Sequence, residues 1–214
     1  MKFPCGNAVS PRVGRHAGRG MRIALSLLAF LAAAAAFPAP GHALDRIDRS
    51  GFALGIGAGY GSVDVRADNV SRNSYGSFAL GFRCGYAVAP YAVVGLELNG
   101  WTLKGYDAGD PSKGESLGNS SLFVDAFPVG QIPFYLAGGV GRLSYSNNRP
   151  GGGGRDTGRS WFLGAGYEIP ISARWQAVPQ LRYSRGRFTG GNFGVYELSV
   201  GLNWYSGRRA GPAR

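Results

Sequence analysis

From residue 51 onward, large apolar side chains alternate with small or polar ones at a period of two residues. In the segment 51–63, Phe52, Leu54, Ile56 and Tyr60 occupy even positions, whereas glycine fills most of the odd positions. This part of the chain shows no 3.6-residue period of useful length, so amphipathic helices are not predicted. Alternation over about ten residues is typical of β-strands whose two faces meet different surroundings.

The same alternation occurs in eight segments, each of which puts its bulkier side chains on one face. The pattern is less clean in the fourth and fifth segments than in the others. We predict one antiparallel strand from each of the segments 51–63, 75–88, 91–103, 119–129, 133–145, 160–170, 173–184 and 193–205.

The links between these segments differ in length in a regular way. Three links are tight and contain proline, at Pro90, at Pro128 with Pro133, and at Pro170. The other four links are longer and comprise 64–74, 104–118, 146–159 and 185–192. Short turns at one end and long loops at the other are typical of outer-membrane barrels, and strands of about ten residues match a tilted bilayer span. We therefore predict an all-β fold, an eight-stranded antiparallel transmembrane up-and-down β-barrel over residues 51–205.

The outward face decides between a membrane barrel and a soluble one. A soluble barrel or sandwich would pack its large apolar side chains inside and expose many Lys and Glu, but the small-and-polar face here has few charges. We predict that the bulky face contacts lipid and keep the soluble fold as the alternative. Aromatic residues lie toward the ends of the bulky face, as two interfacial girdles require. They are Phe52, Tyr60, Tyr86, Trp161, Tyr167, Trp175, Tyr183, Tyr196 and Trp204.

Six ionisable residues lie on the small-and-polar face, namely Arg83, Glu97, Asp125, Glu168, Arg182 and Glu197. An arginine that faces lipid near the midplane costs about 2 to 4 kcal/mol, so Arg83 should point into the lumen. There it needs carboxylate partners, for which Glu97, Glu168 and Glu197 are candidates. Eight strands enclose a lumen that side chains can fill, so we expect a plugged barrel held by these charges. A gated proton or ion path is the alternative.

The segment 21–43 has the features of a secretory signal peptide. It begins with one arginine, continues with an apolar stretch from Ile23 to Phe37, and ends in small residues at Ala43. A transmembrane anchor is the alternative, although the apolar stretch is shorter than the roughly 20 residues that such a helix needs. Residues 1–20 lack any periodicity, so we predict a non-native extension there and a true start at Met21.

Cleavage after Ala43 would leave a periplasmic lead-in at 44–50, the barrel at 51–205 and a basic C-terminal tail at 206–214. The net charge falls from +11 to +6 because Lys2, Arg12, Arg15, Arg19 and Arg22 are removed with the leader. Residues 44–214 retain Cys84 as their single cysteine and contain no histidine. We expect no metal site and no cofactor. No basic run is interleaved with stacking aromatics, so nucleic acid is not a predicted partner.

Three pieces of the chain resemble strands of a known group. They are Gly81-Phe82-Arg83-Cys84-Gly85-Tyr86, Val94-Gly95-Leu96-Glu97-Leu98 and Leu136-Ala137-Gly138-Gly139-Val140-Gly141. Together with their order and spacing, they are similar to small outer-membrane β-barrel proteins such as the transmembrane domain of outer membrane protein A and the opacity-type surface proteins. The resemblance implies a periplasmic N-terminus and a role of the loops in adhesion, surface recognition or envelope integrity. The residues after Trp204-Tyr205 depart from that group, whose chains usually end on an aromatic residue.

The resemblance also bears on catalysis and partners. Some small outer-membrane barrels are enzymes that use histidine as a base, and the chain after residue 43 has none, so we expect no enzymatic activity. We also expect a monomer. A narrow channel for small solutes and a lipid-modifying enzyme are the alternative functions. Basic residues of the predicted loops favour an anionic partner such as lipopolysaccharide phosphates, and a host or envelope ligand could also bind there. These residues are Arg142, Arg149, Arg155 and Arg159.

Overall fold

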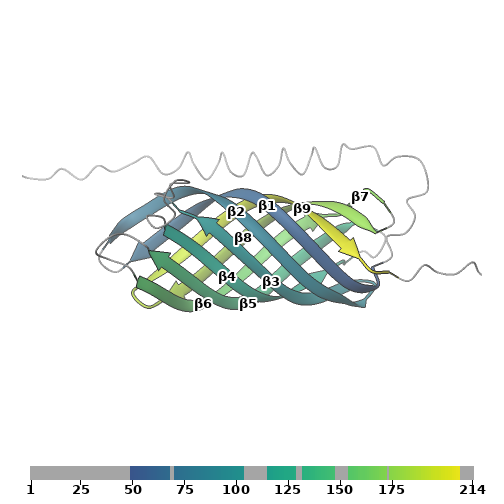
Figure 1. Ribbon diagram of the computed structural model, residues 1–214, viewed down its shortest axis with the longest axis horizontal. Coiled ribbons are helices and arrows are strands. Elements are labelled where there is room, and N and C mark those ends of the chain that lie inside the picture. Colours follow the sequence, from purple (N-terminus) through teal and green to yellow (C-terminus); the bar gives the residue numbers. More distant parts are fainter. Residues whose placement is uncertain are drawn as a thin grey trace, which may run out of the picture. The chain divides into compact units, whose positions relative to one another are not determined.

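The strands form a closed antiparallel barrel. The structure is a computed structural model that describes residues 49–67, 70–103, 115–128, 132–147, 154–172 and 174–207. The strands are β1 (Gly51–Ala67), β2 (Val70–Ala89), β3 (Ala92–Thr102), β4 (Glu115–Ala126), β5 (Phe134–Asn147), β6 (Gly154–Tyr167), β7 (Ile169–Pro170), β8 (Trp175–Phe188) and β9 (Gly191–Tyr205). Neighbouring strands pair antiparallel, β1 pairs with β9, and pairing of β6 with β8 closes the barrel (Figure 1).

The short strand β7 continues β6 rather than adding a ninth position to the barrel. Only Glu168 separates the two strands, and both pair with β8. The predicted eight-stranded up-and-down barrel is therefore confirmed. Among the described residues, no helix is long and apolar enough to cross a membrane. The predicted extension 1–20, the leader 21–43, most of the lead-in 44–50 and the tail after residue 207 lie outside the described residues.

The predicted long loops are wrong in extent, because the strands run further than the apolar alternation does. Much of 64–74, 146–159 and 185–192 belongs to strands, and β4 begins inside 104–118. Backbone pairing continues after the side chains have changed from apolar to polar, since the ladder hydrogen bonds do not depend on the side chains. The last of these links is only Thr189-Gly190, where Gly190 adopts a φ of 80° that favours glycine in a tight turn.

The bulky face points outward, as predicted. Leu54, Leu80 and Leu198 are 41%, 59% and 45% exposed, whereas the inward-facing Phe123 and Phe162 are buried. Large apolar side chains thus cover the outer wall on every side, and the soluble alternative, in which they would fill the centre, is wrong. Cys84, which shares the outward face of β2, is exposed on this wall.

The outer apolar side chains form a band of nearly constant height. In β1 the band runs from Phe52 to Tyr60, and in β9 from Tyr196 to Trp204. Nine residues at about 3.3 Å rise and about 40° tilt span roughly 22 Å, close to the roughly 25 Å apolar band of outer-membrane barrels. Beyond the band, the next outward position on each strand is polar or glycine. These positions are Ser62, Gly76, Gly100, Ser120, Arg142, Arg159, Arg185 and Gly194.

Side chains fill the lumen in three layers. The turn end of the barrel, where β1 begins and β9 ends, holds a cluster of Ala87, Val93, Phe123, Phe127, Tyr135, Ala137, Phe162, Val178 and Tyr205. The opposite loop end holds a second cluster of Val63, Ala79, Trp101, Leu103, Leu117, Leu143, Phe193 and Val195. Between the two lies a polar layer. In β2, for example, Arg83 is placed between Ala79 and Ala87 of the two clusters.

The inner face of β1 leaves room for this filling. It carries Gly55, Gly57 and Gly59 at the level of the polar layer, and Gly57 pairs with Gly201 of β9. A Cβ added at Gly55 would lie 2.7 Å from Cγ of Arg83. The long side chains of other strands therefore occupy the space that glycine leaves open.

Candidate functional site

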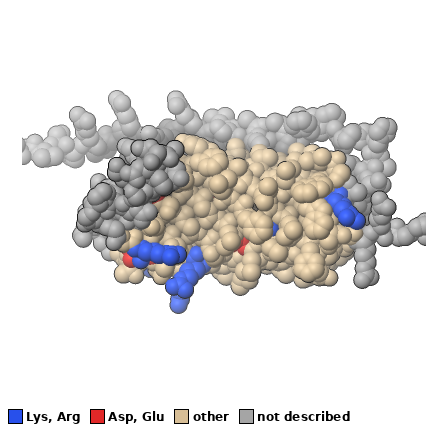
Figure 2. Space-filling model, viewed as in Figure 1, with Lys and Arg blue, Asp and Glu red and all other residues tan. Residues whose placement is uncertain are grey.

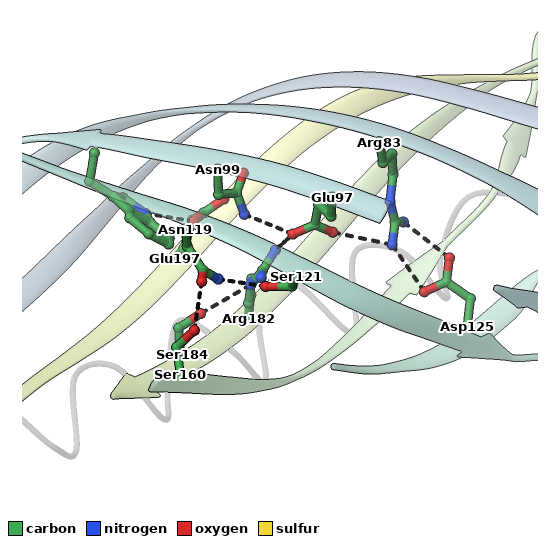
Figure 3. A network of polar contacts seen from close by, with 11 residues as sticks. Arg83, Glu97, Asn99, Asn119, Ser121, Asp125, Ser160, Arg182, Ser184 and Glu197 are labelled. Carbon is green, nitrogen blue, oxygen red and sulfur yellow. Dashed lines mark hydrogen bonds and ion pairs between the residues drawn. The ribbon is translucent and has the colours of Figure 1, made fainter. Parts of the chain in front are cut away.

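The polar layer is built from inward-facing positions of several strands. Its members are Arg83 on β2, Glu97 and Asn99 on β3, Asn119, Ser121 and Asp125 on β4, Ser160 on β6, Arg182 and Ser184 on β8, and Glu197 on β9. Figure 3 shows these side chains pointing toward one another inside the barrel. The period of two places each of them on the luminal face of its strand.

Arg83 links two strands through its guanidinium. Its Nη1 lies 3.1 Å from Oδ2 of Asp125, and its Nη2 lies 3.3 Å from Oε2 of Glu97 (Figure 3). The guanidinium also lies over the ring of Phe123, with its Cζ 4.1 Å from the ring centroid. Arginine is suited to this position because its planar group can pair with carboxylates and stack on an aromatic face together.

Arg182 has the same kind of environment on the other side of Glu97. Its Nη1 pairs with Oε1 of Glu97, and its Nε donates a hydrogen bond of 3.0 Å to Oγ of Ser184. Its Cζ lies 3.6 Å from the centroid of the Phe162 ring. Glu97 therefore joins two arginines, and the negative charges of Glu97 and Asp125 are balanced by the positive charges of Arg83 and Arg182.

Hydrogen bonds from neutral donors extend the layer toward the loop end. Asn99 donates to Oε1 of Glu97 over 3.0 Å, and the indole Nε1 of Trp101 donates to Oε2 of Glu197 over 2.8 Å. On β4, which pairs with β3, Asn119 accepts from Ser160 of β6 over 2.6 Å and donates to Ser121 over 2.7 Å. Trp101 thus belongs to the loop-end cluster with its ring and to the polar layer with its N–H.

A second polar cluster lies at the turn end. Nε of Arg49 is 2.7 Å from Oε2 of Glu168, and the hydroxyl of Tyr205 donates a hydrogen bond of 2.6 Å to Oε1. Glu168 is fully buried, and the Cζ of Arg49 lies 3.8 Å from the centroid of the Phe127 ring. This cluster ties the residues before β1, the break between β6 and β7, and the end of β9 together.

The structure places all six predicted ionisable residues inside the barrel but changes their pairing. Of the three carboxylates expected to pair with Arg83, only Glu97 does so. Glu168 pairs with Arg49, and Glu197 accepts from Trp101. Asp125 takes the second place beside Arg83, although the sequence had not assigned it as a partner. The expectation for Glu168 and Glu197 is wrong because partners depend on height in the lumen as well as on facing.

The predicted girdle aromatics lie on the outer wall toward the two ends of the apolar band. At the loop-end edge, the rings of Trp161 and Tyr183 are 5.7 Å apart and those of Tyr183 and Tyr196 are 4.6 Å apart. At the turn end, the rings of Phe52 and Tyr86 meet edge to face at 5.4 Å. The remaining positions are Tyr60 at the loop-end edge and Tyr167, Trp175 and Trp204 at the turn end.

The predicted loop arginines lie on strands, which corrects their location. Arg142 lies on β5, Arg155 and Arg159 lie on β6, and all three are exposed on the outer face near the loop end. Arg149 lies outside the described residues. Arg185 and Arg187 of β8, which the sequence had left in a predicted loop, are exposed beside them. Figure 2 shows arginine side chains near the loop end and also at the turn end, whereas the middle of the visible face is almost uncharged.

The comparisons with known proteins follow the same architecture. The profile of the outer membrane protein beta-barrel domain matches residues 24–205. The chain belongs to this family. It is an outer-membrane protein, and the predicted localisation is confirmed to that extent. No curated protein sequence matches the chain significantly.

Several solved barrels are similar to this member of the family. Neisserial surface protein A (NspA) has 19% sequence identity and a TM-score of 0.54, over 72% of this chain and 97% of that chain. Ail, the attachment invasion locus protein of Yersinia pestis, has 18% identity and a TM-score of 0.44, over 72% and 99%. The outer membrane protein OprG from Pseudomonas aeruginosa has 15% identity and a TM-score of 0.42, over 75% and 99%. At these identities the likeness is one of fold.

The polar layer of this family member contains a small cavity rather than a wide lumen. The cavity measures about 40 Å³, and Arg83, Glu97, Gln180, Arg182 and Glu197 are among its lining residues. Nε2 of Gln180 and Nη2 of Arg182 are buried without a protein partner among the described residues. A few water molecules would fit there and hydrogen-bond to these two groups. Within the described residues, no group of three or more His, Cys, Asp or Glu could hold a metal ion.

Proposed function

We propose that the protein is a non-conducting, non-enzymatic outer-membrane barrel that stabilises the envelope and displays its loop end for surface recognition. The observation that carries this proposal is the filled lumen, in which Arg83 and Arg182 bridge opposite strands through Glu97. Apolar clusters lie on both sides of this bridge. A solute path along the barrel axis would need all three layers to rearrange together.

The energetics of the polar layer support a static plug. Breaking a buried ion pair by removing one partner typically costs about 3 to 5 kcal/mol. Glu97 and Asp125 are both paired with Arg83. Opening the lumen would therefore break more than one buried ion pair. The alternative of a narrow channel for small solutes needs a continuous polar path, and the cavity of about 40 Å³ offers only a short piece of one.

The chemistry of the buried groups supports a role without catalysis. Glu97, Asp125 and Glu168 each accept a charged hydrogen bond from an arginine, which leaves these carboxylates poorly suited to act as a general base. Residues 44–214 contain no histidine to activate a serine or a water molecule. These features weigh against the lipid-modifying alternative, for which a changed acyl pattern of lipid A in cells that make the protein would be the evidence.

The rest of the proposal concerns maturation and orientation. The segment 21–43 is removed after Ala43, and the barrel inserts as a monomer with its turn end in the periplasm. Periplasmic turns are short in this class, and the longest link between strands, 103–114, lies at the loop end. The links 103–114 and 148–153 then face the exterior, where a host or envelope ligand would meet them. The N-terminal sequence of the mature protein tests the cleavage.

The decisive experiment separates conduction from insertion. Refolded protein is first shown to be inserted by its different gel mobility before and after boiling, and is then studied in planar bilayers. We expect no stable unit conductance steps. Regular steps of one size from protein that passes the mobility assay would overturn the non-conducting assignment.

Recognition is tested on cells. A variant in which 104–114 is replaced by a short Gly-Ser linker should keep its heat-dependent mobility and detergent resistance but lose attachment to ligand-bearing surfaces. An Arg83→Leu variant should instead lose detergent resistance. Equal attachment by the linker variant and the unchanged protein would show that residues 104–114 are not needed for recognition.

A further inference from the structure

We infer that the outer wall carries a binding site for the phosphate of a phosphorylated lipid headgroup, formed by Arg159, Arg185 and Arg187 beside Trp161. The inference goes beyond the recognition role of the loops, because it concerns the strands below them. It rests on the proposed orientation, in which the loop end faces the exterior.

The arginines lie side by side because of the strand register. Arg142 of β5 is the Cα partner of Arg159 of β6, and Arg159 is the partner of Arg187 of β8. Trp161 lies two residues nearer the membrane centre than Arg159, and Arg185 lies two residues nearer than Arg187. Trp161 and Arg185 are also Cα partners. The outward positions of three adjacent strands thus place four positive charges in one small area of the wall.

This area is hollowed rather than convex. Arg159, Trp161, Arg185, Arg187 and Asn192 line a depression in the outer wall, with the small residue Gly186 among them. Guanidinium groups and an amide therefore surround a recess that a headgroup can enter. An arginine fork is well suited to phosphate oxygens, which it can bind through two parallel N–H groups.

The arginines are not neutralised by acidic side chains of the described part of the chain. Arg142 contacts the hydroxyl of Thr157 at 3.5 Å, Arg155 donates to Ser144 at 3.0 Å, and no ion pair links Arg159, Arg185 or Arg187 to a described carboxylate. Like charges directly opposite each other on paired strands destabilise the pairing. An anion from outside the protein would relieve this repulsion.

The height of the site indicates a lipid rather than a free anion. Trp161, Tyr183 and Tyr196 form the loop-end edge of the apolar band, and Arg159 of β6 is the next outward position beyond Trp161. On β8 the outward position next to Tyr183 is Arg185, and Arg187 follows it. The arginines therefore lie at headgroup level, where basic residues attract anionic lipids. Acyl chains of the same molecule would continue down the wall past Val140 and Leu163, which are exposed below the site.

The experiment compares two acyl-matched lipids on one protein. Refolded protein in neutral detergent micelles is titrated with bisphosphorylated lipid A or with its dephosphorylated form, and bound lipid is counted by native mass spectrometry. We expect the phosphorylated form to bind at least about fivefold more tightly for each arginine that engages it. The triple variant Arg159→Gln, Arg185→Gln, Arg187→Gln should lose this preference.

A matched variant controls for unspecific charge loss. Arg174→Gln removes an exposed arginine at the turn end and should leave the preference unchanged. Unchanged lipid binding by the triple variant would overturn the inference, as would equal displacement of the lipid by millimolar inorganic phosphate, which would indicate a free-anion site. If the triple variant lost binding to a sulfated polysaccharide but kept its binding of lipid, that result would also overturn the inference.

The orientation of the barrel is tested separately, so that a failure of the lipid site and a failure of the proposed orientation are distinguishable. Thr189→Cys in a Cys84→Ser background puts one thiol in the tight turn at the loop end. A membrane-impermeant maleimide should label it in intact cells. Labelling only after the outer membrane is permeabilised would show the orientation to be reversed, whatever the result in micelles.

Discussion

The guanidinium carbon of Arg182 lies 3.6 Å from the centre of the Phe162 ring, while the same group is paired with Glu97. Arg83 and Phe123 repeat this arrangement, and so do Arg49 and Phe127 at the turn end. Each of these buried arginines is therefore held by a carboxylate at its edge and by an aromatic ring at its face. The lumen accommodates positive charge by surrounding it with these two kinds of partner.

Removal of Arg83 should destabilise the barrel strongly. Arg83→Leu leaves Asp125 without its partner, so the free energy of unfolding should fall by about 3 to 5 kcal/mol. Arg174→Leu at the exposed turn end should change it by less than about 0.5 kcal/mol. Urea unfolding in lipid vesicles, followed by tryptophan fluorescence, measures both. Equal midpoints would show that Arg83 does not hold the plug.

Glu97 should matter more than Asp125, because it contacts two arginines and an asparagine. Glu97→Gln should lower the free energy of unfolding more than Asp125→Asn, which loses contacts to Arg83 alone. In a double-mutant cycle, Glu97→Gln with Arg182→Leu should show a coupling of about 0.5 to 3 kcal/mol. Strict additivity of the two substitutions would mean that the pair contributes nothing.

Two glycines on opposite faces should respond differently to the same substitution. Gly55→Leu introduces a Cβ that would lie 2.7 Å from Cγ of Arg83, and this collision should cost about 1 to 3 kcal/mol. Gly100→Leu has open space around its Cβ on the outer wall and should be tolerated. Heat-dependent gel mobility gives the melting temperature of each. A melting temperature lower for Gly100→Leu than for Gly55→Leu would contradict the assigned faces.

The hydroxyl of Tyr205 should stabilise the turn end. Tyr205→Phe removes the donor to Glu168 and leaves a fully buried carboxylate with Arg49 as its remaining partner. An unsatisfied buried acceptor costs about 1 to 3 kcal/mol. Tyr91→Phe, at an exposed turn position, serves as the control. Differential scanning calorimetry in micelles should show a lower transition for Tyr205→Phe only.

Strand number and facing could be predicted from the sequence because lipid and lumen impose opposite demands on successive residues. The ends of the strands could not, since the ladder of β8 and β9 continues to Phe188 and Gly191 where the apolar alternation has stopped. For the same reason Arg185 and Arg187 were placed in a loop. Their outward position on a strand follows only from their pairing with β6.

The ion pairs were predictable to the extent that they are local. Arg83 and Glu97 lie at nearly equal distances from the turn at Pro90-Tyr91, so hairpin register alone brings them opposite each other. Asp125 is one strand further away, on β4, and reaches Arg83 past the intervening strand β3. That contact depends on two successive registers, β2 with β3 and β3 with β4, which no single segment of the sequence determines.

The pairing of Gly57 with Gly201 has a consequence for assembly. The first and last strands meet at this height without side chains that must interlock, so the barrel wall can be sealed by backbone hydrogen bonds alone. The ion pairs of the polar layer join Arg83, Glu97 and Asp125 with Arg182, and all four lie on other strands. The seam between β1 and β9 therefore holds no charged side chain of these ion pairs at the height of Gly57 and Gly201.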